Sequence, residues 1–178
     1  LLSLAMFCAY IFVDILSPIK ELMQEQRGWD STAFGTMQGS ETFLNVFVFF
    51  LIFAGIILDK MGVRFTAILS GAVMLTGALI KYYAISDSFA GSALDIWFTD
   101  HLNHIPVFEQ LGVSPFYEGM PASAKVAACG FMIFGCGTEM AGITVSRGIV
   151  KWFKGREMAL AMGSEMALAR LGVATCMI

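Results

Sequence analysis

The sequence predicts an all-helical integral membrane protein with five spanning helices. Hydrophobic residues make up 57% of the 178 residues and charged residues only 14%, and the mean hydropathy is +0.74. These values lie outside the range that is typical of soluble domains. The apolar residues also fall into long runs, and a helix needs about 20 apolar residues to cross a bilayer.

The first apolar run covers residues 1–19 and is interpreted as the first span. It has no signal-peptide pattern. It also starts without a methionine and already inside the apolar run, so we expect the chain to be a piece of a longer protein. Asp14 lies within this run, where a carboxylate costs roughly 2.5–3.5 kcal/mol on insertion scales. It is therefore expected to face a cavity with a role in transport, or to be a buried, hydrogen-bonded structural group. Pro18 is expected to kink or end the helix.

The second predicted span covers residues 33–58 and follows a polar connection over residues 20–30, in which Asp30 is a candidate N-cap. Glu41 and Asn45 lie about one helical turn apart, so they share a face. A polar stripe in an apolar helix is expected to point away from lipid. It either lines a solute pathway or joins neighbouring helices through hydrogen bonds.

The third predicted span covers residues 65–86, with Lys81 and the two tyrosines after it as an anchor at the membrane interface. An outer loop over residues 87–123 follows, in which residues 96–98 are interpreted as part of a short interfacial helix. Two histidines in this loop, His101 and His104, are interpreted as solvated side chains. The sequence therefore predicts neither a metal site nor a cofactor.

The fourth and fifth predicted spans cover residues 124–150 and 157–178. Glu139 lies in the fourth span, whose four glycines predict close packing against other helices. In the fifth span, a stripe of small residues that includes Gly163 is followed on nearly the same face by Arg170. Glu165 is expected to lie close enough to the lipid headgroups to be hydrated. The four glycines are Gly130, Gly135, Gly137 and Gly142.

Two charged turns predict which side of the membrane the connections face. The turns at residues 59–64 and 147–156 hold six of the eleven lysines and arginines. Short loops rich in Lys and Arg stay on the cytoplasmic side. Both turns are therefore expected to face the cytoplasm, with the loop at 87–123 on the opposite side.

The first charged turn is part of a segment with the pattern GxxxDKxGxR, from Gly55 to Arg64. Gly55 is expected to let two helices approach closely, and Gly62 to permit the tight turn. Lys60 and Arg64 hold the turn on the positive side, and the Asp59 carboxylate is suited to face a helix N-terminus. This pattern resembles the loop between the second and third helices of major facilitator superfamily transporters.

A second segment extends the resemblance. The sequence VKWFKGREMALAMGSEMALARLG, residues 150–172, resembles the passage from helix four to helix five in the branch that contains lysosomal dipeptide carriers and their bacterial relatives. Glu139 in a glycine-rich fourth helix and Arg170 in the fifth also match that branch. The resemblance covers most of the chain.

This resemblance implies that the chain forms most of the N-terminal six-helix bundle of a major facilitator fold, with the C-terminal half absent. Such carriers enclose a substrate between two halves and expose it alternately to each side. The implied function is secondary active or facilitative transport of a small polar solute, such as a dipeptide or another zwitterionic or organic-anion metabolite. Glu139 and Arg170 would bind its amino and carboxyl ends, with Asp14 and Glu41 as further substrate-binding candidates. The alternative for Glu139 and Arg170 is a salt bridge between the fourth and fifth helices.

Other functional classes are weighed against transport. A membrane scaffold or assembly subunit would use the glycine-rich helices to bind partners, and a major facilitator carrier of another class would move an organic anion or a sugar. The sequence lacks HExxH, GxSxG and cofactor fingerprints, so an enzyme is not predicted. It also lacks a basic patch with interleaved aromatic residues, so nucleic acid is not an expected partner. The expected partners are a small solute, the lipid bilayer and the other half of the carrier, in a bacterial inner membrane.

The predicted orientation is tested by labelling single cysteines with an impermeant thiol reagent in intact cells. We expect Met61→Cys and Lys154→Cys to be protected and His104→Cys to react, because the first two positions lie in the cytoplasmic turns. Reaction at residues 61 and 154 together with protection at residue 104 would show that the orientation is reversed.

Overall fold

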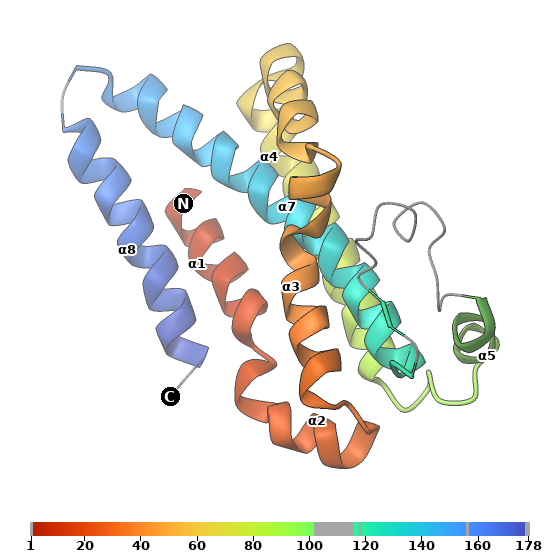
Figure 1. The fold of residues 1–178 in the computed structure, drawn as a ribbon. Helices are drawn as coiled ribbons and strands as arrows, with labels where there is room; N and C mark the ends of the chain where they lie inside the picture. The colour runs from red at the N-terminus through yellow and green to blue at the C-terminus, as the bar shows by residue number, and fades with distance from the viewer. Residues whose placement is uncertain (1, 102–115, 118, 156, 177–178) are drawn as a thin grey trace.

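The computed structural model describes residues 2–101, 116–117, 119–155 and 157–176, and this part of the chain consists of helices without a strand (Figure 1). The prediction of an all-helical protein is therefore confirmed for the described residues. The elements are α1 (Leu2–Asp14), the 3₁₀ helix η1 (Ser17–Ile19), α2 (Lys20–Arg27), α3 (Ser31–Phe47), α4 (Phe50–Ile85), α5 (Ala93–His101), α7 (Ala122–Phe153) and α8 (Met158–Cys176).

Three described segments are long and apolar enough to cross a membrane, namely Ser3–Arg27, Phe50–Ile85 and Ala122–Phe153. The prediction of five spans is not confirmed. With 17 residues, α3 is about 26 Å long at 1.5 Å per residue, which is shorter than the ~30 Å hydrocarbon core. Charged and small polar residues lower the hydropathy of α8.

The first predicted span and the connection after it are corrected by the structure. The helix α1 already ends at Asp14, and Pro18 lies in η1, where its fixed φ is tolerated. Residues 20–27 form α2 rather than a polar loop, and α2 ends at Gly28, whose φ is +66°. Ser3–Arg27 is thus a helix interrupted by a proline turn.

The predicted N-cap of the next helix is confirmed. The Asp30 carboxylate accepts hydrogen bonds from the backbone N–H of Ala33 at 2.7 Å and from the hydroxyl of Tyr117 at 2.6 Å. The Tyr117 hydroxyl bond, followed by the Ala33 bond, lowers the pKa of Asp30. Cap and tyrosine together tie the start of α3 to the segment that precedes α7.

The second predicted span, residues 33–58, is broken in the structure. The helix α3 ends at Phe47, Phe49 has a left-handed φ of +52°, and α4 begins at Phe50. Residues 46–50 are all β-branched or aromatic, and such side chains lose rotamer freedom in a helix. Further along, Gly62 interrupts α4 with φ +81° and ψ 168°. The break in the predicted turn thus lies at a glycine, the residue that adopts a positive φ at the least steric cost.

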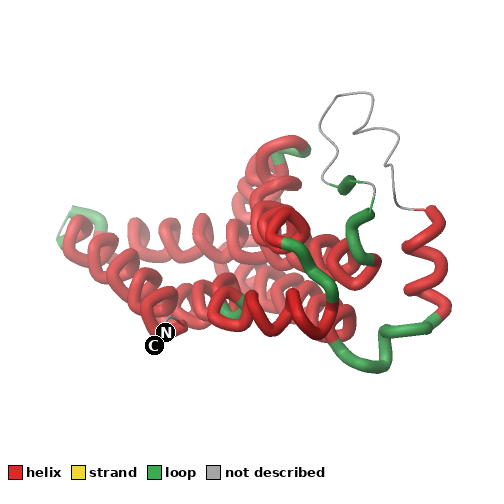
Figure 2. The backbone as a smooth tube through the Cα atoms, turned by 60° about the horizontal axis from the view of Figure 1, so that its bottom comes forward, coloured by secondary structure: helices red, strands yellow, loops and turns green. Residues whose placement is uncertain are grey.

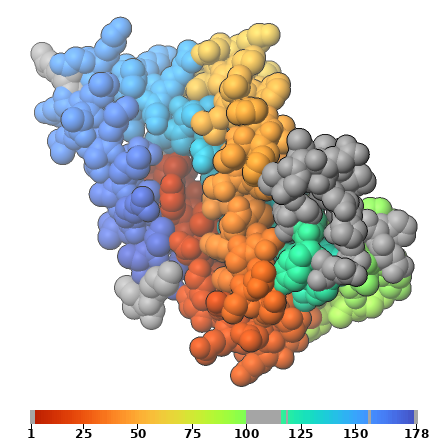
Figure 3. Space-filling view, in the orientation of Figure 1, coloured from red at the N-terminus to blue at the C-terminus, as the bar shows by residue number. Residues whose placement is uncertain are grey.

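Central to the packing is α7, which is buried along most of its length and lies against α4 and α3. The helix α8 lies against α1 (Figures 1 and 2). In the space-filling view, α8 and α1 form one side of the molecule, and α3 crosses the face beside them (Figure 3). The helices therefore form two groups, an α1–α8 pair and an α3–α4–α7 group.

The predicted close packing of the fourth span is confirmed at three of its four glycines. A Cβ atom on Gly130 would lie 2.8 Å from the backbone nitrogen of Lys81, and one on Gly137 would lie 2.6 Å from Met74 Cγ. A Cβ atom on Gly135 would overlap the backbone carbonyl of Glu41. A Cβ atom on the fourth glycine, Gly142, would lie 3.8 Å from Met6 Cε, which is an ordinary van der Waals distance.

The helix contact predicted at Gly55 is not found in the described chain, and Gly163 also has no near neighbour there. No heavy atom lies within 4 Å of a Cβ placed on either residue, because both lie on faces without a neighbouring helix. The close approaches occur elsewhere on the same helices. A Cβ on Gly77 of α4 would lie 2.5 Å from Phe134 N, and one on Gly172 of α8 would lie 2.5 Å from Phe7 O.

The α4–α7 contact predicts opposite results for two glycines of α4. We expect Gly77→Ala to destabilise the protein by about 1–3 kcal/mol, because the added methyl meets backbone atoms of Gly130 and Phe134. Gly71→Ala is the matched control, since nothing lies within 4 Å of its Cβ position and alanine favours the helix by about 1 kcal/mol. Thermal unfolding of the reconstituted protein measures both, and equal midpoints would contradict this packing.

Candidate binding site

A cavity of about 170 Å³ lies between the α1–α8 pair and the α3–α4–α7 group. Three of its lining residues are carboxylates that come from three different helices: Glu41 of α3, Glu139 of α7 and Glu165 of α8. We call this cavity the acidic pocket. Its other lining residues include Met6, Tyr10, Val13, Thr138, Ser146 and Ala169.

Glu41 is held in the acidic pocket by the contact between α3 and α7. The Ser40 hydroxyl lies 3.0 Å from the Ala128 carbonyl and 2.6 Å from the Met37 carbonyl, so it joins the two helices. Because Gly135 has no side chain, the backbone of α3 lies directly on α7 at Glu41. Glu139 follows Gly135 by about one helical turn, and Glu41 and Glu139 line the same cavity.

Asn45, on the same stripe as Glu41, has a different role. Its Nδ2 donates to the Gly135 carbonyl at 3.3 Å. The helix-joining role expected of the polar stripe is confirmed at Asn45, and its role in a solute pathway stays a prediction. Glu41 lines a cavity, and Asn45 holds two helices together.

Glu165 is the functional candidate that sequence reasoning undervalued. It was expected to be hydrated near the headgroups, but only 6% of its surface is exposed. Glu165, Ala169 and Gly172 are the buried residues of α8, and their spacing of four and three residues is that of one helical face. The small residues Ala169 and Gly172 at these spacings were the signal that this face packs on α1.

Arg170 is not brought together with Glu139. It is exposed and does not line the acidic pocket. Five residues after Glu165, it lies about 140° around the helix from the buried face. The seven-residue spacing places Arg170 and Gly163 on nearly the same face of α8, and both residues are exposed.

Asp14 also lies outside the acidic pocket. Its carboxylate accepts from Gln38 Nε2 at 3.2 Å, and the Ser17 hydroxyl lies at 3.5 Å. Gln38 Nε2 also donates to the Val13 carbonyl at 3.1 Å. Asp14 therefore helps to join the end of α1 to α3, as a hydrogen-bonded structural carboxylate would.

The charged turn around Gly62 is held to α7 by an ion pair between Asp59 and Arg147. Both side chains are exposed, as are Lys60 and Arg64. Asp59, whose carboxylate is suited to face a helix N-terminus, thus pairs with an arginine side chain of α7. The pair joins the two predicted cytoplasmic turns to each other.

Lys81 departs most from its predicted place. It was expected to anchor α4 at the interface, but only 6% of its surface is exposed, and its ammonium lies 3.9 Å from the ring centroid of Phe131. Gly77, Lys81 and Ala84 are all buried and share the face of α4 that packs on α7. In the sequence, the small residues Gly77 and Ala84 on either side of Lys81 indicated that this face packs against another helix.

No group of three or more His, Cys, Asp and Glu side chains is placed to hold a metal ion in the described part of the chain. The side chains of His101 and His104 lie outside the described residues.

Comparison of the chain with protein-family models, curated proteins and solved structures gives no match. The resemblance to major facilitator carriers therefore stays a prediction. A functional proposal therefore rests on the three carboxylates that line the acidic pocket.

The exposed ion pair between Asp59 and Arg147 predicts a small effect on stability. We expect Asp59→Asn and Arg147→Gln to show a coupling of roughly 0.2–1 kcal/mol in a double-mutant cycle, because solvent screens exposed charges. Lys60→Gln is the control, since Lys60 is equally exposed and lies outside the pair. A loss of several kcal/mol in either single variant would show that the pair is buried against a further segment.

Proposed function

We propose that this chain is part of a membrane transporter for a small polar solute, and that the acidic pocket binds the cationic end of that solute. The observation that carries the proposal is the convergence of Glu41, Glu139 and Glu165 on one small cavity. Ionisable residues within membrane-spanning segments are costly, and they usually mark substrate or ion pathways. Three carboxylates from three helices thus favour a ligand site over chance placement.

Electrostatics favours a cation as the bound group. Among the described residues, the lining of the acidic pocket contains three carboxylates and no lysine or arginine. Ionised carboxylates that share a cavity repel one another, and the repulsion grows as the effective dielectric constant falls. A bound ammonium group relieves this repulsion and donates hydrogen bonds to the carboxylate oxygens. The same lining disfavours an organic anion at this position.

The size of the pocket limits how much of the solute it holds. Its volume of about 170 Å³ is smaller than the ~300–1,000 Å³ of typical small-molecule pockets. It therefore suits the amino end of a zwitterion, such as a dipeptide, rather than the whole molecule. The binding of the carboxyl end by Arg170 stays a prediction that requires a surface beyond the described chain.

The location of the pocket fits alternating access. Its walls come from both helix groups, with Tyr10 and Glu165 on the α1–α8 side and Glu41 and Glu139 on the α3–α7 side. A shift of one group against the other would open or close a site placed between them. We place this carrier in a bacterial inner membrane, on the resemblance of its charged turns to those of major facilitator proteins.

The scaffold alternative has a weaker basis. Glycines with open space at their Cβ positions, such as Gly55 and Gly163, would suit a partner helix. A scaffold, however, gives no reason to bring three carboxylates into one cavity at the cost of burying them. A carrier accounts for both features, since its second half would supply the partner helices.

Substitution of the pocket carboxylates tests the proposal. We expect Glu139→Gln and Glu165→Gln each to weaken binding of a dipeptide with a free amino terminus about tenfold or more, because a charge-assisted hydrogen bond is lost. Binding of the N-acetylated dipeptide should not change. Ligand-induced thermal shifts measure both, and Glu25→Gln is the control, since Glu25 is exposed and lies outside the pocket.

Two outcomes would count against this function. Equal effects of the substitutions on free and acetylated dipeptides would show that the carboxylates support the fold rather than the ligand. Binding that persists unchanged in Glu139→Gln and Glu165→Gln would place the ligand elsewhere.

A further inference from the structure

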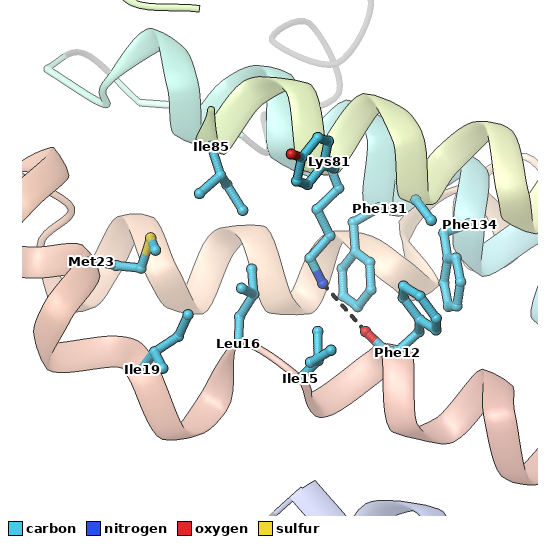
Figure 4. A pocket seen from close by; sticks show the side chains of 11 residues that line it. Phe12, Ile15, Leu16, Ile19, Met23, Lys81, Ile85, Phe131 and Phe134 are labelled. Atoms are coloured by element: carbon cyan, nitrogen blue, oxygen red, sulfur yellow. Dashed lines mark hydrogen bonds between the residues drawn. The ribbon is translucent and has the colours of Figure 1, made fainter. Parts of the chain in front are cut away.

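A second cavity, of about 290 Å³, lies between α4, α7 and the segment that runs from α1 through η1 to α2 (Figure 4). Lys81 is the charged residue among its eleven lining residues, and the others are aliphatic or aromatic side chains. We call this cavity the lysine pocket. It shares no lining residue with the acidic pocket.

The ammonium group of Lys81 is poorly satisfied where it lies. Its Nζ is 3.5 Å from the Phe12 carbonyl oxygen (Figure 4), which is longer than the ~2.7–3.2 Å of an ordinary N–H···O hydrogen bond. An ammonium group has three donors, and no carboxylate in the described residues forms an ion pair with this one. The second contact of the ammonium group is the face of Phe131. The site therefore holds a buried cation with unused hydrogen-bonding capacity.

The nearest acidic groups do not complete the site. Asp14 and Glu41 are the carboxylates whose charges act on Lys81, but neither lines the lysine pocket. They lower the cost of burying the ammonium group, although they supply no hydrogen bond to it from within the cavity. An anion that enters the cavity would accept hydrogen bonds from the ammonium group.

The walls of the pocket define the rest of the ligand. Leu16, Met23, Ile85 and Phe134 present aliphatic and aromatic surface (Figure 4), which gains free energy by burying apolar groups. Access runs past Phe12, Ile15 and Tyr82, whose side chains are 47%, 45% and 74% exposed. The cavity is thus apolar and open, with its cation at the inner wall.

We propose that the lysine pocket binds an amphipathic anion, whose single carboxylate meets Lys81 and whose apolar body fills the cavity. The volume is close to the lower limit of ~300 Å³ for small-molecule pockets, so it suits a single-chain or single-ring acid rather than a two-chain phospholipid. Such an acid can come from the bilayer, as a fatty acid, or from water, as an aromatic acid. The site is separate from the acidic pocket and takes ligands of the opposite charge.

The test uses the full chain in nanodiscs of zwitterionic lipid and measures equilibrium binding of radiolabelled dodecanoate. We expect Lys81→Met to weaken this binding about tenfold or more, because methionine keeps the length of the side chain but not its charge. The matched control is Lys20→Met, since Lys20 is exposed and lies outside the pocket. A purely structural role of Lys81 would leave dodecanoate binding unchanged, and that result would overturn the proposal.

Further probes separate the charge requirement from the source of the ligand. Dodecanol has the same chain without the charge, and we expect it to bind at least about tenfold more weakly than dodecanoate. Equal binding of dodecanol would overturn the role of Lys81 as the anion partner. Phenylacetate probes the aqueous source. Lys81-dependent binding of phenylacetate alone would assign a soluble aromatic acid, and binding of dodecanoate alone would assign a membrane-derived one.

A second variant tests the same proposal if Lys81→Met does not fold. Ile15 lines the pocket and is 45% exposed, so Ile15→Trp reduces the volume of the cavity without changing its charge. We expect this variant to keep its thermal midpoint and to lose dodecanoate binding. Retained binding in a folded Ile15→Trp protein would show that the ligand lies elsewhere.

Discussion

The contact on which the rest of the structure depends is the backbone-to-backbone approach of α7 to its two neighbours. At Gly77 and Gly130 the backbones of α4 and α7 lie so close that a single added methyl would meet main-chain atoms. At Gly135 the same is true of α3. Dispersion contacts and small interfacial residues are the main source of helix association in lipid, where the hydrophobic effect does not distinguish neighbours from acyl chains. Both cavities border the interfaces that these contacts define.

The two cavities differ in how their charges are compensated. The acidic pocket concentrates negative charge between the two helix groups, and the lysine pocket places one cation against apolar walls. Glu41 belongs to the first cavity, yet its charge also reaches Lys81. Occupation of either site would therefore change the electrostatic environment of the other, since charges interact over longer distances inside a protein than in water.

The sequence predicted the helices better than the faces on which their functional residues lie. Apolar run length and the cap at Asp30 located most helices, and the glycines of α7 located its contacts. The break at Phe49 was missed because a continuous apolar run carries no signal for a left-handed residue. The position of Glu165 was misjudged for a different reason. Periodicity shows which residues of α8 share a face, but only the contact with α1 decides which face is buried.

The left-handed conformation of Phe49 has a mechanical consequence. Because the chain turns there, α3 and α4 are two separate rods rather than one, and a displacement of Glu41 is not passed along the backbone to Asp59. The continuous connection between them is α7, which touches Glu41 at Gly135 and Asp59 at Arg147. These two points lie about 18 Å apart along one helix. Any rigid-body movement of α7 would therefore shift one wall of the acidic pocket and the charged turn around Gly62 at the same time.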